Sequence, residues 1–194
     1  MLFALYITVF VCAAWRLLDR RQESRMSDVV STTFTAAYVP FLASFVVLML
    51  GAWRNPWMFV VFELMVIAND TGGWAAGVLF GKHPMAPTLS PKKSWEGFAG
   101  SALTAVGVGT VGLWWLGADW WWGIIAGISI AFVGTMGDLT ESLIKREAGL
   151  KDMSKILPGH GGVLDRVDAL LMSAPVAYFI FAWALPGISW ESSH

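Results

Sequence analysis

Long apolar stretches alternate with short polar segments along the whole chain. A helix needs roughly 20 apolar residues to cross about 30 Å of hydrocarbon, with all its backbone hydrogen bonds closed within itself. Six stretches approach this length, at residues 1–18, 34–53, 57–80, 97–116, 120–137 and 169–185. The pattern predicts an all-α fold, a polytopic integral membrane helical bundle of about six transmembrane helices whose cytoplasmic loops form the functional site.

The composition supports a membrane protein and argues against a soluble enzyme. Hydrophobic residues make up 56% of the 194 positions and charged residues 14%, whereas soluble domains average roughly 45–50% apolar and about 25% charged residues. The net charge of −1 provides no general attraction to nucleic acid, so we expect no nucleic-acid partner.

The cations predict the orientation of the bundle. Twelve of the 13 Lys and Arg residues fall in loops on one side of a six-span arrangement, and Arg54 falls on the other side. Short loops rich in Lys and Arg remain in the cytoplasm, and Trp residues, which here cluster at the opposite ends of the spans, prefer the membrane interface. We therefore expect a multi-pass protein of the cell (inner) membrane with an active site on the cytoplasmic side.

The chain is predicted to be a single membrane-embedded domain over residues 1–194, with its motifs concentrated in 69–168. The first residue opens directly in an apolar stretch. From this we expect that spans found upstream in related proteins are absent from this chain.

The third apolar stretch contains Glu63, Asn69 and Asp70. Ionisable groups at membrane depth are costly and are usually functional. Glu63 and Asp70 lie two helical turns apart and share a helix face, which we expect to point into the bundle. Residues 71–73, Thr-Gly-Gly, are expected to loosen the helix and free backbone carbonyls for a ligand. The alternative is that these polar residues only lock helix packing.

The segment 90–97, SPKKSWEG, places two cations before the fourth stretch. Adjacent lysines such as Lys92 and Lys93 ordinarily contact anionic lipid headgroups. Here Ser94 can cap the following helix, with Glu96 in its first turn. A helix N-terminus beside two lysines suits a bound phosphate, so this segment is a candidate anion site.

The densest charged segment, 138–168, carries five basic and six acidic residues. Asp138 lies at the end of one predicted helix, and Asp165 and Asp168 lie at the start of the last one. Such a mixture suits Mg²⁺ held by carboxylates while Lys and Arg bind phosphate oxygens. The intervening Gly-rich segment around His160 lets the backbone approach a ligand closely; the alternative is that His160 stabilises a turn.

Three blocks of the chain resemble the phosphatidate cytidylyltransferase (CDP-diacylglycerol synthase) family. The most specific runs from SLIKR at 142–146 through Lys151 and Asp152 to LPGHGGVLDRVD at 157–168. The segments 69–73 (NDTGG) and 90–97 resemble two further family blocks in the same order. Trp74 stands where the family pattern leads us to expect a smaller aromatic residue such as Tyr.

The resemblance implies transfer of CMP from CTP to phosphatidate, yielding CDP-diacylglycerol and pyrophosphate for phospholipid biosynthesis. It also implies dependence on Mg²⁺, with room for a second cation, and a homodimer in contact with membrane lipids. The implied metal ligands are Asp138, Asp165 and Asp168. The implied catalytic residues are Asp138, Asp165, Lys145, Arg146 and Arg166. The implied substrate-binding residues are Ser142, Lys151, Asp152, His160, Gly161, Gly162, Lys92, Lys93, Ser94, Asn69 and Asp70.

Three other functions are compatible with parts of the sequence. A CTP-dependent lipid-alcohol kinase would use similar residues but release CDP in place of pyrophosphate. A cation transporter would use Glu63, Asn69 and Asp70 as an ion path, which leaves segment 138–168 unexplained. A catalytically inactive membrane scaffold is the third alternative.

Overall fold

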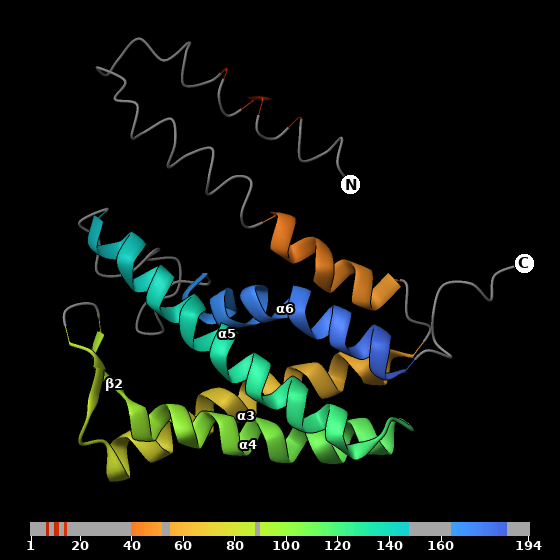
Figure 1. Ribbon diagram of the computed structural model, residues 1–194. Coiled ribbons are helices and arrows are strands. Elements are labelled where there is room, and N and C mark those ends of the chain that lie inside the picture. Colours follow the sequence, from red (N-terminus) through yellow and green to blue (C-terminus); the bar gives the residue numbers. More distant parts are fainter. Residues whose placement is uncertain are drawn as a thin grey trace, which may run out of the picture.

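Helices and one short β-hairpin make up the described part of the protein (Figure 1). The computed structural model describes residues 40–51, 55–87, 90–147 and 164–185, together with positions 7, 10, 11 and 14, but not the side chains at 141, 144–147 and 164–168. The elements are a helix at Pro40–Gly51, α3 (Pro56–Phe80), β1 (Pro84–Ala86), β2 (Ser90–Ser94), α4 (Trp95–Trp115), α5 (Trp120–Glu147) and α6 (Leu164–Ala184).

The last four predicted spans coincide with α3 to α6, which confirms a helical fold for this part of the chain. Within the described residues, α4 and the Trp120–Thr140 part of α5 are long and apolar enough to cross a membrane, and Pro40–Gly51 and Ala169–Ala184 are shorter apolar helices. The first predicted span, 1–18, lies almost entirely outside the described residues. These findings fit a membrane protein, and the number of six spans stays a prediction.

Two of the helices begin at polar capping residues. The Asn55 side chain accepts a 3.1 Å hydrogen bond from the Trp57 backbone N–H at the start of α3. Ser94 Oγ accepts a 3.1 Å hydrogen bond from the Gly97 N–H at the start of α4, which confirms the predicted cap. Such caps satisfy N–H groups that have no partner inside the helix.

The contact between α3 and α4 is closer than ordinary side chains allow. A Cβ on Gly72 would lie 2.1 Å from Thr104 Oγ1, and a Cβ on Gly73 would lie 2.2 Å from Ser101 Oγ. Both hydroxyls donate 2.7 Å hydrogen bonds to backbone carbonyls of α3. The expectation that residues 71–73 loosen the helix is wrong, because α3 runs through them unbroken and uses its glycines for packing.

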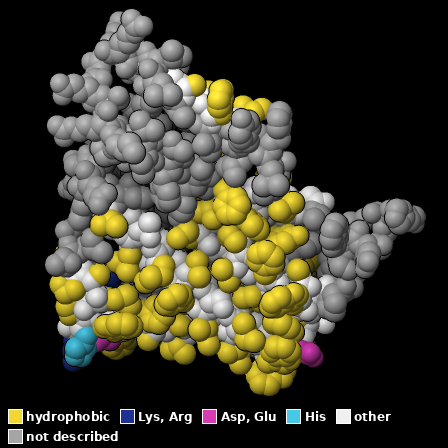
Figure 2. Space-filling model, turned by 45° about the horizontal axis from the view of Figure 1, so that its top comes forward, with side chains coloured by type: hydrophobic (Ala, Val, Ile, Leu, Met, Phe, Trp, Pro, Cys, Tyr) yellow, Lys and Arg dark blue, Asp and Glu magenta, His cyan; other side chains and the backbone are white. Residues whose placement is uncertain are grey.

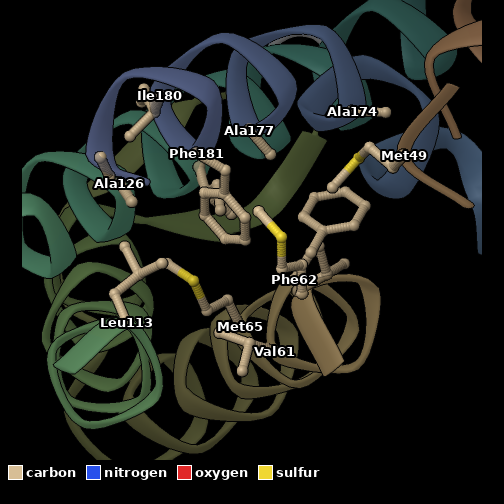
Figure 3. Close-up of a cluster of buried hydrophobic side chains, with 14 of the residues drawn as sticks. Met49, Val61, Phe62, Met65, Leu113, Ala126, Ala174, Ala177, Ile180 and Phe181 are labelled. Carbon is tan, nitrogen blue, oxygen red and sulfur yellow. The ribbon is translucent and has the colours of Figure 1, made fainter. Parts of the chain in front are cut away.

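The core lies where α3, α4, α5 and α6 meet. Figure 3 shows Phe62 and Met65 of α3 facing Phe181 of α6, with Leu113 of α4 beside Met65. All four side chains are fully buried. On the other side of the cluster, α6 presents alanines such as Ala177, whose small side chains allow the helices to approach closely.

The outer surface is strongly apolar. On the face in Figure 2, hydrophobic side chains cover most of the described surface, and charged side chains lie at its edges. Leu79 and Leu103, for example, are 72% and 74% exposed. Soluble monomers rarely expose continuous apolar surface of this kind, so the face is suited to lipid contact.

Most of the exposed Trp residues gather at one end of the bundle, whereas Trp74 and Trp95 are exposed at the other end. Trp57 at the start of α3 packs edge-on against Trp115 at the end of α4, with ring centroids 5.5 Å apart. Trp120 and Trp121 at the start of α5 are also exposed. The hairpin of β1 and β2 lies at the other end, between α3 and α4 (Figure 1). Trp is enriched at both membrane interfaces, so the arrangement is typical of interfacial aromatic belts, with most of the Trp residues opposite the hairpin.

Candidate active site

A cavity of about 510 Å³ opens at the hairpin end of the bundle. Six of the predicted site residues line it, namely Asn69, Asp70, Lys92, Lys93, Ser94 and Asp138. They come from α3, from β2 and from α5, so three segments far apart in the sequence meet around one space. The other lining residues are Gly73, Trp74, Gly77, Met85, Gly97, Phe98, Ser101 and Thr135.

The α3 side of the cavity is organised by Asn69. Its side-chain Nδ2 donates a 3.1 Å hydrogen bond to Asp70 Oδ1, and its backbone carbonyl accepts from Ser101 Oγ. Asn69 is 5% exposed, and its Oδ1 atom is buried with no hydrogen-bond partner in the described structure. A buried acceptor without a partner is costly, so Asn69 is kept here at some expense of stability.

An ion pair links the hairpin to α5 at the cavity. Lys93 Nζ donates to Asp138 Oδ2, although the two residues are 45 positions apart in the chain. The side chains are 24% and 37% exposed, respectively, so the pair is partly withdrawn from water. Within the described residues, this contact joins a predicted phosphate-binding lysine directly to a predicted metal ligand.

The hairpin itself is tied to the start of α4. His83 Nδ1 lies 2.6 Å from Glu96 Oε1, the His83 backbone N–H donates to Glu96 Oε2 at 3.3 Å, and the Trp95 N–H donates to the His83 carbonyl at 3.0 Å. β1 and β2 pair antiparallel, with Pro84 opposite Ser94. These bonds hold β2, and with it Lys92 and Lys93, against the cavity. The sequence did not predict this hairpin.

The predicted site residues beyond Asp138 are described only in part. Ser142 is one turn further along α5; its hydroxyl donates a 2.8 Å hydrogen bond to the Asp138 carbonyl, and it is not among the described residues that line the cavity. Lys145 and Arg146 follow on α5, and Asp165, Arg166 and Asp168 lie in the first turns of α6, in each case as backbone only. Lys151, Asp152, His160, Gly161 and Gly162 lie outside the described residues.

The backbone brings the start of α6 to the cavity end of α5. A Cβ on Gly134 would lie 3.9 Å from Ala169 Cβ, so the two helices touch there. Asp138 is one turn beyond Gly134 on α5, and Asp165 is one turn before Ala169 on α6. Because successive helices run in opposite directions, the two aspartate positions lie at a similar level of the bundle.

The described donors fit the ligand preferences of Mg²⁺. Among the described residues, no group of three or more His, Cys, Asp or Glu side chains could hold a metal ion. The cavity nevertheless is lined by Asp70 and Asp138, whose carboxylates are oxygen donors of the kind that Mg²⁺ prefers. Mg²⁺ typically takes one or two carboxylates and completes its shell with water and substrate phosphates, so a larger protein cluster is not required.

Several lining residues escaped the sequence analysis. Thr135 lies three residues before Asp138 on α5, and Ser101 lies four residues after Gly97 on α4. Both share a helix face with a motif residue, and this spacing was the signal that could have identified them. Glu63, two turns before Asp70, is not among the described lining residues.

An apolar helical bundle with a charged cavity at one end fits a membrane protein. The sequence model described as the Cytidylyltransferase family matches residues 1–184. The chain belongs to this family.

Individual relatives agree with the family resemblance. The phosphatidate cytidylyltransferase of Mycobacterium bovis is 42% identical over 186 residues, covering 89% of this chain and 60% of that protein. That of Mycobacterium leprae is 43% identical over 193 residues, covering 88% of this chain and 60% of the relative. That of Haemophilus influenzae is 37% identical over 155 residues, with 74% and 54% covered. The chain thus spans little more than half the length of these relatives.

Proposed function

We propose that this protein is a phosphatidate cytidylyltransferase, which transfers CMP from CTP to phosphatidate and releases CDP-diacylglycerol and pyrophosphate. The observation that carries the proposal is the single cavity at which residues of NDTGG, SPKKSWEG and the start of the 138–168 segment meet. The names of the relatives supply the substrates.

The proposed reaction asks mainly for charge neutralisation. A phosphate oxygen of phosphatidate attacks the α-phosphorus of CTP, a new P–O bond forms, and the bond to the β-phosphate oxygen breaks to release pyrophosphate. The attacking oxygen is already ionised at neutral pH, so no strong general base is needed. The obstacle is the approach of two polyanions, which positioned cations relieve.

The lysines of β2 are proposed to bind one of the two anions. Lys92 and Lys93 line the cavity beside the capped N-terminus of α4. A helix N-terminus adds partial positive charge to that of the lysines, which favours a phosphate at this position. Lys145, Arg146, Lys151 and Arg166 are proposed to hold the remaining phosphate oxygens, as the family resemblance implies.

Mg²⁺ is proposed to bind Asp138 and Asp165, with Asp168 as a further ligand or an orienting group. When bound, the ion would neutralise charge on the α-phosphate and on the departing pyrophosphate. The carboxylates of Asp70 and Asp138 at the cavity support this assignment.

We also propose that the cavity faces the cytoplasm from a multi-pass bundle in the inner membrane. The cavity end carries Lys92 and Lys93, and most of the exposed Trp residues lie at the opposite end. This polarity agrees with the positive-inside rule. The homodimer implied by the family is a proposal of the same kind, and the mass of the purified protein in detergent tests it.

The decisive experiment measures pyrophosphate release by the full chain in detergent with CTP, phosphatidate and Mg²⁺, each omitted in turn. We expect release only when all three are present, together with labelled CDP-diacylglycerol. Release of CDP in place of pyrophosphate would favour a lipid-alcohol kinase. Ion flux in liposomes without nucleotide would favour a transporter, and a folded protein that gives no product would contradict catalysis by this chain alone.

A further inference from the structure

We infer that the Lys93 ammonium occupies the place of a divalent cation at the Asp138 carboxylate. When a divalent cation binds Asp138, the ammonium leaves the carboxylate and binds a nucleotide phosphate. The divalent cation and the nucleotide would then enter the site together, each promoting binding of the other. The inference rests on the proposed function and adds to it an exchange of partners within the cavity.

The contact that carries the inference is the Lys93–Asp138 ion pair. Lys93 Nζ donates to Asp138 Oδ2, and both residues line the cavity. Both side chains are partly buried, at 24% and 37% exposure. Water screens such a pair less than a fully exposed one, so the ammonium competes effectively with other cations for this carboxylate.

A metal ion and the ammonium cannot share Asp138 Oδ2 without repelling each other at short range. A divalent cation bound to this oxygen therefore displaces Lys93 from it and deprives the ammonium of this ion pair. A nucleotide phosphate removes this penalty, because it offers the ammonium new oxygen acceptors. By thermodynamic linkage, the nucleotide changes the affinity for the metal ion by the same factor as the metal ion changes the affinity for the nucleotide.

The exchange requires little movement of the backbone. The bonds between His83 and Glu96 fix the hairpin that carries Lys93. The lysine side chain has a flexible four-carbon stem, so its head can move from a carboxylate to a nearby phosphate by rotation of side-chain bonds.

Lys92 provides a matched control on the neighbouring position. It lines the same cavity and carries the same charge, but its side chain is exposed. Among the described residues, no ion pair within 4.0 Å joins Lys92 to a carboxylate. Replacement of Lys92 therefore tests the effect of a lost charge, whereas replacement of Lys93 tests the contact itself.

The test measures Mn²⁺ binding to the full chain in detergent by electron paramagnetic resonance, with and without CTP. In the unmodified protein we expect CTP to tighten Mn²⁺ binding. Lys93→Gln should tighten Mn²⁺ binding without CTP by about tenfold and reduce the CTP effect to about twofold, within the usual range of coupling between sites. Lys92→Gln should tighten Mn²⁺ binding alone by no more than about twofold.

Further variants separate the outcomes. Lys93→Arg keeps the charge and should keep the coupling, and it serves as a second variant if Lys93→Gln fails to fold. Equal effects of the Lys92 and Lys93 substitutions, unchanged Mn²⁺ affinity in Lys93→Gln, or Mn²⁺ binding that survives Asp138→Asn would each overturn the inference. If Mn²⁺ and CTP still promote each other's binding in a protein that makes no CDP-diacylglycerol, that result would contradict the proposed reaction and not the inference.

Discussion

The Asn69 side chain orients the carboxylate of the next residue, Asp70. Its buried side-chain amide donates a 3.1 Å hydrogen bond to Asp70 Oδ1 at the cavity, while its own Oδ1 has no partner in the described structure. An almost fully enclosed residue therefore orients an exposed one, and the position of Asp70 depends on the packing of α3 against α4.

Replacement of Asn69 by Ala should impair activity more than stability. A hydrogen bond to a charged group is worth about 1.5–3 kcal/mol, so we expect CMP transfer to fall by about tenfold or more. The unpartnered acceptor disappears in the same change, which offsets part of the lost stability. Ser173→Ala is the control, because Ser173 Oγ is also buried with no hydrogen-bond partner among the described residues but does not line the cavity. It should retain full activity, and an equal loss in both variants would argue against a role for Asn69 at the site.

Replacement of Asp138 by Asn should abolish CTP-dependent product formation while membrane insertion is retained. We expect a loss of about 100-fold or more, because the amide cannot supply the charge that holds a metal ion. Asp165→Asn should behave in the same way. Asp119→Asn makes the same chemical change at the opposite end of α5, in the turn before Trp120, and should leave turnover unchanged. Turnover like that of the unmodified protein in Asp138→Asn would remove the metal assignment.

Replacement of Gly72 by Ala should destabilise the bundle. Its Cβ would lie 2.1 Å from Thr104 Oγ1 and 2.8 Å from the Gly100 carbonyl, so α3 and α4 must separate. We expect a loss of about 1–3 kcal/mol, seen as a lower thermal midpoint in detergent. Gly107→Ala is the matched control on α4, where a Cβ meets nothing within 4 Å. It should be neutral or stabilising by up to about 1 kcal/mol.

Replacement of Glu96 by Gln should loosen the hairpin. The charge that holds His83 is lost, although the amide oxygen can still accept a hydrogen bond from the His83 N–H. We expect backbone amides of β1 and β2 to exchange with solvent about tenfold faster, with a weaker effect on α4, because local opening is governed by local contacts. Hydrogen exchange read by mass spectrometry measures this directly. Unchanged exchange in the hairpin would show that strand pairing alone positions Lys92 and Lys93.

The apolar pattern predicted the existence of α3 to α6 well and their ends less well. The predicted span 120–137 stops before the charged residue Asp138, whereas α5 continues to Glu147. Hydropathy measures the segment that fits the hydrocarbon, but the helix continues wherever backbone bonding permits. Asp138 consequently lies within a helix, and Ser142 uses its hydroxyl within that helix.

The sequence predicted several residues of the site but not the contacts between them. The motifs identified Lys93 and Asp138, but nothing local states that residues 45 positions apart form an ion pair. The glycines of NDTGG suggested a loosened helix, because a glycine that loosens a helix and one that admits a neighbouring helix look alike in sequence. His83 lies outside any motif, and its contact with Glu96 depends on the hairpin.

The hydroxyls of Ser101 and Thr104 have a consequence for the insertion of α3 and α4 into the membrane. Each donates its hydrogen to a backbone carbonyl of α3. Alone in a bilayer, α4 would leave Thr104 with only its own backbone carbonyls, such as that of Gly100, as acceptors, and Ser101 would lose its acceptor on α3. When α4 is paired with α3, its hydroxyls are hydrogen-bonded and it exposes mainly apolar side chains to lipid. We therefore expect the translocation machinery to release the two helices into the bilayer together.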